Sequence, residues 1–288
     1  MGYLFFAWVA SFLYAFEVII SKIVSKYSLK NPWLFNFVWS FLIVIFTFPV
    51  ALIEGISMPK DWFDLLLAGF LYALSGILFI ITLYRLDVSI LAPLFNVRSA
   101  MSVLLGVLFL NELISVEQAL LIVIIFVTSI FVTLDERWSL RSFLRPAILL
   151  AILNALCLSL LGVFIKKSIA ENGYWATTFF MPLISQIFLL LTIPKFTNSI
   201  RSINYRSFTV VSLIALAGTL GTFAANKAFA ENVSISTVIL SLPMSMIMVF
   251  LLSRFKPELL EKHTNKVYLV RFIAVGIMIT AAVKLSVG

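Results

Sequence analysis

Two charged side chains lie inside long apolar segments of this sequence. Arg98 is near the middle of VSILAPLFNVRSAMSVLLGVLFL, and Glu17 interrupts FFAWVASFLYAFEVIISKIV. A charge at the centre of a bilayer is opposed by about 2.5–3.5 kcal/mol on insertion scales, so such residues normally face a bundle interior or a wet cavity. A guanidinium can bind an anionic group through two parallel hydrogen bonds, and a desolvated carboxyl can carry a proton. Both residues are therefore candidates for substrate binding, and Glu17 is also the candidate for proton coupling.

The same two residues also have a structural interpretation. A buried salt bridge between Glu17 and Arg98 would fix the first apolar segment against the fourth. Burying either ion alone is strongly unfavourable, whereas a well-bonded pair can roughly break even. Both interpretations can hold together if a substrate carboxylate or a proton competes for one partner.

Other polar and aromatic side chains lie at a similar depth in neighbouring segments. The predicted site around Arg98 and Glu17 comprises Tyr14, Trp39, Tyr72, Asn96, Ser102, Gln186 and Asn226. For any one of them, hydrogen bonding between helices is an equally good explanation. Lysines and arginines near segment ends can extend their charged groups to the membrane surface, so the prediction leaves out Arg85, Lys166, Lys167 and Lys227.

The residue types do not favour catalysis or metal binding. The chain has one histidine and one cysteine, Cys157, and it has no G-x-x-x-x-G-K-[ST] phosphate loop. No paired carboxylates stand at a catalytic spacing. We expect no enzyme activity, no cofactor and no metal site, and a transport step without ATP.

The elements that must position these residues are membrane spans. The 288 residues are 62% hydrophobic and 12% charged, against about 45–50% and about 25% in a soluble domain. Bilayer hydrocarbon offers no hydrogen bonds to the backbone, so apolar runs of about 18–25 residues should be helical. The sequence predicts an all-α, multi-pass protein of the cell (plasma or inner) membrane with about ten helices, at residues 3–27, 33–53, 62–84, 88–110, 115–134, 146–170, 174–194, 208–230, 234–255 and 267–287.

The chain repeats itself. LDVSILAPLFN, from Leu86, and ENVSISTVILS, from Glu231, share Val-Ser-Ile at an offset of 145 residues. Gly76 with Gly221, and Lys22 with Lys167, keep the same offset. A register held over most of a half-chain indicates an internal duplication.

Each half then contains about five spans, an odd number, so the second half enters the membrane from the opposite side. Such inverted repeats are typical of secondary transporters, whose substrate sites lie near the midplane between the halves. We predict a first repeat at residues 1–135, a basic linker at 136–145 and a second, inverted repeat at 146–288. Small residues spaced for close helix packing support this arrangement: Gly69, Ala73, Gly76, Gly218, Gly221 and Ala225.

With this repeat, the sequence resembles the drug/metabolite transporter superfamily, in particular its ten-helix EamA-type branch. The resemblance also rests on the passage YRLDVSILAPLFN and on VLFLNELISVEQ, where family members often carry a Gly-Glu-like step that Glu112 matches. The family often has proline in its fourth and ninth helices. Pro243 keeps this pattern in the second half, and Arg98 departs from it in the first. The resemblance implies alternating access by two pseudosymmetric bundles, often in exporters of amino acids, metabolites or organic cations.

A second likeness concerns the first span. FEVIISKIVSKYS is similar to the first helix of small multidrug resistance transporters, in which a glutamate carries proton and cationic drug in turn. The lysine spacing differs, and Glu17 aligns with Gly162 in the second half rather than with another glutamate. This likeness implies a proton-coupling role for Glu17 alone.

The leading hypothesis is a secondary transporter that moves amino acids or related zwitterions or anions by alternating access, in the export direction. One alternative is a proton-coupled exporter of organic cations or drugs that uses Glu17. Another is a flippase for lipid-linked carriers, with Arg98 holding a phosphate head. The expected partners are a small-molecule substrate and the lipid bilayer, with no nucleic acid, and the chain acts as a monomer or as a dimer.

The net charge of +8 is distributed unevenly. The first, fifth, seventh and ninth loops contain Lys26, Lys30, Arg137, Arg141, Arg145, Lys195, Arg201, Arg206, Arg254, Lys256, Lys262 and Lys266. Even-numbered loops hold little beyond Lys60. By the positive-inside rule the odd-numbered loops are cytoplasmic and both termini lie outside, whereas the habit of the resembling family favours cytoplasmic termini.

Overall fold

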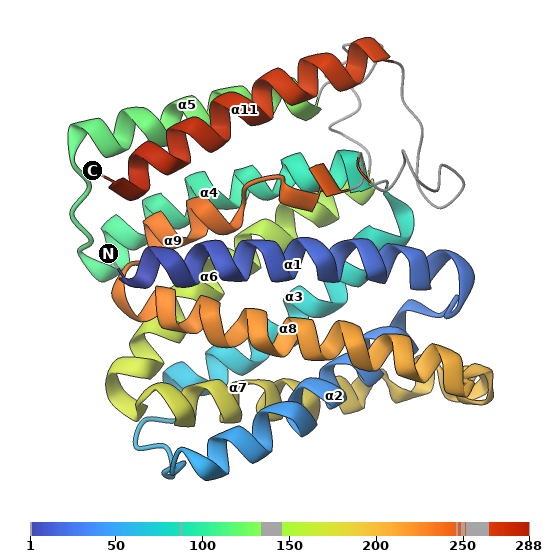
Figure 1. Ribbon diagram of the computed structural model, residues 1–288. Helices are drawn as coiled ribbons and strands as arrows, with labels where there is room; N and C mark the ends of the chain where they lie inside the picture. Colours follow the sequence, from blue (N-terminus) through green and yellow to red (C-terminus); the bar gives the residue numbers. More distant parts are fainter. Residues whose placement is uncertain are drawn as a thin grey trace.

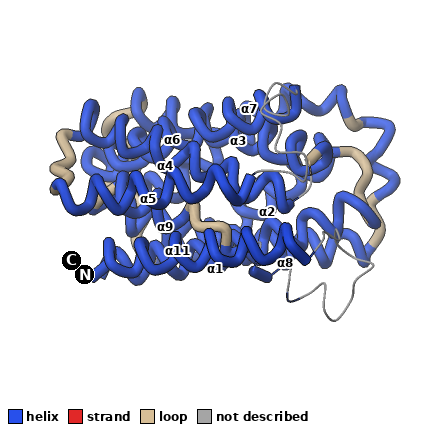
Figure 2. Tube along the Cα trace, turned by 90° about the horizontal axis from the view of Figure 1, so that it is seen from above, coloured by secondary structure: helices blue, strands red, loops and turns tan. Residues whose placement is uncertain are grey.

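The computed structural model describes residues 2–86, 88–133, 146–245, 247–248, 251 and 265–287, without the side chains of 88–96, 129–133, 265–268, 271 and 286–287. All regular structure in this part of the chain is helical, as predicted (Figures 1 and 2). The helices are α1 Gly2–Tyr27, α2 Pro32–Ile53, α3 Phe63–Arg85, α4 Val88–Leu110, α5 Val116–Thr133, α6 Pro146–Asn172, α7 Tyr174–Leu189, α8 Tyr205–Glu231, α9 Val233–Leu240 and α11 Asn265–Val287, with two 3-10 helices, η2 Leu190–Lys195 and η3 Thr197–Ser202. The predicted linker at residues 136–145 lies outside the described residues.

The helices have the length and composition of membrane spans. Within the described residues, α1, α2, α3, α6, α7 with η2, and α8 are each apolar and long enough to cross a bilayer. Shorter apolar stretches lie in α4, α5 and α11. Large apolar side chains such as Phe41, Leu104 and Leu213 remain exposed on the outer faces of the bundle. Lipid tails are as apolar as these side chains, so this exposure fits a multi-pass membrane protein.

The predicted span at residues 234–255 is interrupted. Its first helix, α9, ends at Leu240 and Ser241 caps it, and the described residues are helical again from Met244. Pro243 explains the end, because proline has no backbone N–H and disfavours helical geometry in the residue before it. By contrast α4 continues through Arg98, the equivalent position of the first half.

The two halves pack against each other in matching pairs. α1 lies along α8, and α3 lies along α6, so the first helix of each half contacts the third helix of the other. α5 and α11, the last helices of the two halves, lie side by side at the upper edge in Figure 1. The first and third helices of the two halves therefore make equivalent contacts.

Glycines let α8 approach α1 closely. A Cβ at Gly221 would lie 2.8 Å from Cε1 of Tyr14, and one at Gly218 would lie 3.1 Å from Oε2 of Glu17. The prediction that these glycines serve helix packing agrees with this geometry. The close contact also brings the polar residues of α1 against the middle of α8.

Candidate functional site

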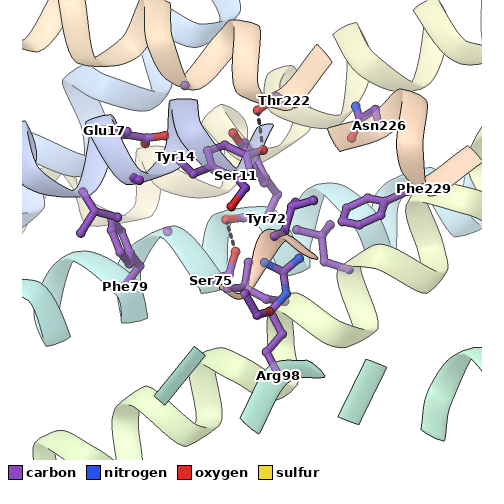
Figure 3. Close-up of a pocket in the computed structure, with 18 of the residues that line it drawn as sticks. Ser11, Tyr14, Glu17, Tyr72, Ser75, Phe79, Arg98, Thr222, Asn226 and Phe229 are labelled. Carbon is purple, nitrogen blue, oxygen red and sulfur yellow. Dashed lines mark hydrogen bonds between the residues drawn. The ribbon is translucent and has the colours of Figure 1, made fainter. Parts of the chain in front are cut away.

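A cavity of about 160 Å³ lies between the helices of the two halves (Figure 3). α1, α3, α4, α6 and α8 contribute to its wall, together with the segment that follows α9. The structure brings these predicted site residues together around it: Tyr14, Glu17, Trp39, Tyr72, Arg98 and Asn226. In secondary transporters built from inverted repeats, the substrate site lies in the corresponding place, between the two halves.

The polar side of α1 faces this cavity. Ser11, Tyr14 and Glu17 are spaced at three-residue intervals, which places them on one side of a helix. Glu17 is 5% exposed, and among the described residues its carboxylate has no ion-pair partner. The Tyr14 hydroxyl lies 3.4 Å from Oγ1 of Thr222 on α8, which fixes the ring across the α1–α8 contact.

Arg98 enters the cavity from α4. Figure 3 shows its guanidinium directed toward the cavity, on the side away from Glu17. Its Cζ lies 6.0 Å from the centre of the Phe229 ring, within the range of a cation–π contact. Its Nε is buried and has no hydrogen-bond partner in the described part of the chain. The backbone at this point is held by the Ser159 hydroxyl of α6, which donates to the Arg98 carbonyl oxygen at 3.1 Å.

Glu17 and Arg98 share the cavity without pairing. The described residues contain no ion pair between them, so the direct salt bridge considered from the sequence is not formed. Tyr14, Ser11 and Tyr72 lie between the two in Figure 3. Two unpaired opposite charges on different sides of one cavity can each bind one end of a dipolar molecule.

The interruption after α9 supplies irregular backbone to the same wall. Leu240, Ser241, Leu242 and Ser245 line the cavity around Pro243. Non-helical backbone at membrane depth is tolerated where protein covers it or where it lines a cavity, and broken helices form the binding sites of many transporters. The C-terminal end of α9 therefore brings its last carbonyl groups near the cavity.

Several polar atoms around the cavity lack partners. Ser11 Oγ, Trp39 Nε1, Arg98 Nε and Ser241 Oγ are buried and make no hydrogen bond within the described residues. Most buried polar atoms in proteins are hydrogen-bonded, because desolvating one without a partner costs about 1–3 kcal/mol. A polar ligand or water in the cavity would satisfy them.

Two other residues from the sequence prediction do not line the cavity, and the side chain of a third is not described. Gln186 is buried on α7 and Ser102 on α4, and neither lines the cavity. The side chain of Asn96 lies outside the described residues. Asn226 lines the cavity, and its Nδ2 also donates to Oγ1 of Thr178 at 3.1 Å, so it serves interhelical bonding as well.

A second polar cluster was not predicted from the sequence, because it joins residues that are far apart in the chain. Glu112, directly after α4, accepts a hydrogen bond from Nζ of Lys166 at 2.8 Å and others from Ser234 and the Val233 backbone. Lys166, which the sequence prediction left out of the site, does not line the cavity but forms an ion pair with Glu112, and its side chain is 23% exposed. Burial raises the pKa of Glu112, but hydrogen bonds from Lys166, Ser234 and Val233 outweigh burial and hold it below its ordinary value. The only sequence signal was the Asn-Glu step.

Metal ligands are not gathered at either place. The described residues contain no group of three or more His, Cys, Asp or Glu side chains that could hold an ion. The side chains that line the cavity offer a ligand charges, hydrogen bonds and aromatic rings.

Comparison with known proteins agrees with the fold. Residues 1–134 match the model of the EamA-like transporter family. This match confirms the resemblance that the sequence showed, and it covers the half that contains both Glu17 and Arg98. The EamA-like match and the apolar helices together indicate a multi-pass membrane transporter of small molecules.

A solved structure supports the fold over the whole chain. The structure described as "Crystal structure of protein" superposes with a TM-score of 0.76, covering 98% of this chain and 95% of that one. The two are 11% identical, so the likeness concerns the fold alone. A search of curated proteins finds no sequence match. The likeness in fold therefore includes the second half, where the family match does not reach.

Proposed function

We propose that this protein is a secondary transporter of amino acids or related zwitterions and anions, working by alternating access in the export direction. The observation that carries the proposal is that Arg98 and Glu17 share one cavity between the halves and that neither forms an ion pair within the described residues. The EamA-like match supports transport of small molecules in general.

The charges of the cavity favour a dipolar substrate. Arg98 offers a planar donor set with a free Nε, which suits a carboxylate. Glu17, on the other side of Tyr14 in Figure 3, suits an ammonium group. A zwitterion would satisfy both ions at once, whereas a simple cation would leave the buried guanidinium without a counter-charge.

The remaining wall suits a small organic side chain. Tyr72, Phe79 and Phe229 present aromatic rings, and Leu158, Leu161 and Met181 present aliphatic surface. A mostly apolar wall with a few polar groups is the usual composition of a small-molecule site. Specificity would then come from the two charges and the unpartnered hydroxyls.

The test is solute flux into proteoliposomes with a trapped pH dye, offering amino acids and organic cations side by side. In Arg98→Met protein we expect amino-acid flux to require at least about tenfold more substrate, because a charge-assisted hydrogen bond is lost. Arg85→Met is the matched control, because Arg85 is exposed at the end of α3, and it should leave flux unchanged. Intact amino-acid flux in Arg98→Met would overturn the proposal.

A second candidate rests on Glu17 alone. Its buried carboxylate has no cationic partner among the described residues, which also suits exchange of a proton for an organic cation. Cation flux coupled to proton movement, lost in Glu17→Gln and retained in Arg98→Met, would favour this candidate. Glu54→Gln, in the exposed turn after α2, is the control for removal of a carboxylate.

A further inference from the structure

The segment that follows α4 binds the second half of the chain. The Glu112 carboxylate is 7% exposed and accepts hydrogen bonds from Lys166 Nζ at 2.8 Å, Val233 N at 2.7 Å and Ser234 N at 2.9 Å, as well as from the Ser234 hydroxyl. Lys166 also donates to the carbonyl oxygen of Glu231 at 2.8 Å. We call Glu112, Lys166, Glu231, Val233 and Ser234 the Glu112 cluster. It joins the end of α4 to α6, to the end of α8 and to the start of α9.

The surrounding backbone is shaped to admit this carboxylate. A Cβ at Gly106 would lie 2.2 Å from Ser234 Oγ and 2.6 Å from Glu112 Oε2, so only glycine leaves room there. A Cβ at Gly162 would lie 2.9 Å from a methyl carbon of Val233. Asn111 has a φ of 51°, and this turn directs the next residue back toward α9. Glycines on α4 and α6 and the left-handed turn at Asn111 thus all make room for the contact between Glu112 and the start of α9.

The cluster lies directly beyond the cavity. Ile165 and Phe229 line the cavity, while Lys166 and Glu231, one and two residues further along the same helices, hold the cluster. In Figure 1 this end of the molecule also contains both termini and the turn between α8 and α9. The cluster therefore ties the two halves together between the cavity and this end.

We propose that the Glu112 cluster is a gate that closes this end of the transport pathway and must separate when the cavity opens there. The inference rests on the proposed function, since a gate requires a pathway. The bonds are suited to reversible closure: they are few, they cross between the halves, and the partly exposed Lys166 gives water access to the ion pair. Alternating access needs a contact of this kind at whichever end is shut.

The first test measures accessibility and needs no substrate. Cys157, the single native cysteine, is replaced by alanine, and Leu240→Cys provides a reporter on the cavity wall. An impermeant thiol reagent is applied to intact cells and to inverted vesicles. Glu112→Gln should label at least about tenfold faster from the side of the α4–α5 turn, a factor that corresponds to about 1.4 kcal/mol.

The matched control removes a similar carboxylate elsewhere. Glu117 forms an ion pair with Lys284 at 2.9 Å, with both side chains 64% exposed, so Glu117→Gln should leave reporter labelling unchanged. Equal labelling rates in Glu112→Gln and the parent protein would contradict the proposed gate. An equal increase in Glu117→Gln would also contradict it, because the faster labelling would then reflect a general destabilisation of the helix bundle.

A second measurement covers the case in which Glu112→Gln does not fold. Glu112→Cys and Lys166→Cys are combined in the Cys157→Ala background and cross-linked by a short bifunctional reagent that a reductant cleaves. Closing the link should lower flux at least about tenfold, and the reductant should restore it. Full flux with the link closed would overturn the gate. A different result would separate the two proposals. If no variant shows flux but Glu112→Gln still labels faster, the proposed transport function would be rejected, while the Glu112 cluster would still control access to the cavity.

Discussion

At the scale of single residues, the backbone at Asn111 explains why the fourth helix ends in an Asn-Glu step. Its φ of 51° is the left-handed conformation, which glycine adopts freely and asparagine tolerates better than most residues. The resembling family's Gly-Glu-like step fits the same requirement. The residue at 111 supplies the turn, and Glu112 then supplies the bonds to α9.

We therefore expect opposite results from two substitutions at this position. Asn111→Gly should keep or slightly raise the unfolding temperature in detergent, whereas Asn111→Val should lower stability by about 1–2 kcal/mol because its side chain opposes a left-handed backbone. Asn198→Val, in the exposed 3-10 segment η3, is the control and should change little. Equal stability of Asn111→Val and the parent protein would show that this turn is not required.

The pH dependence of stability should report the Glu112 carboxylate. Its pKa in the folded protein lies below the ordinary value of 4.5, so its charged form stabilises the fold fully above that value. This contribution is lost as the pH falls through the lowered pKa. Thermal unfolding from pH 7 to pH 3.5 should show the parent losing its advantage over Glu112→Gln only at the acid end. A constant difference over the whole range would contradict this assignment.

The sequence predicted the cavity residues better than the Glu112 cluster, for a physical reason. Glu17 and Arg98 are costly at membrane depth, so a single sequence reveals them without any knowledge of contacts. Lys166 lies near a helix end, where exposure to the membrane surface is also favourable. Its pairing with Glu112 depends on which helices meet in three dimensions, and neither the spacing nor the residue type contains that information.

At the scale of helices, apolar length predicted most boundaries because the bilayer thickness fixes the length of a span. The main exception was the predicted 234–255 span, in which the helix is interrupted between Leu240 and Met244. Hydropathy is insensitive to such a break, since a proline-containing segment can be as apolar as a continuous helix. The repeat did carry the information, because it aligned Pro243 with Arg98, and the two halves differ in structure at that pair.

Replacing glycine by alanine should change the stability of the protein in opposite directions at two positions. A Cβ at Gly69 of α3 would lie 2.5 and 2.7 Å from Cγ2 and Cβ of Ile184 on α7, so Gly69→Ala should destabilise by about 1–3 kcal/mol through overpacking. Gly276 of α11 has open space, so Gly276→Ala should stabilise by about 0.5–1 kcal/mol. Unfolding temperatures of the purified variants decide the matter. A loss of stability in both would mean that helix packing is not what distinguishes the two sites.

At the scale of the whole molecule, the loops divide between the two ends of the bundle. At one end, Asn31 before α2 donates to the Lys195 carbonyl oxygen and to Ser199, which joins the first and seventh loops. At the other end, Asn172 binds Lys60 and Asp61, which joins the sixth and second loops. Figure 1 shows both termini at the end of the second, fourth, sixth and eighth connections. The basic first and seventh loops thus lie at the end opposite the termini.

This division makes orientation testable with two residues. In the Cys157→Ala background, Ser57→Cys marks the second loop and Ser202→Cys marks the seventh, and both positions are exposed. The positive-inside rule depends on lysine and arginine in short loops, so we expect an impermeant thiol reagent to label Ser57→Cys in intact cells and Ser202→Cys only in inverted vesicles. The reverse pattern would place the termini in the cytoplasm. The end closed by the Glu112 cluster would then face the cytoplasm too, and the cavity described here would belong to a state closed on the inside.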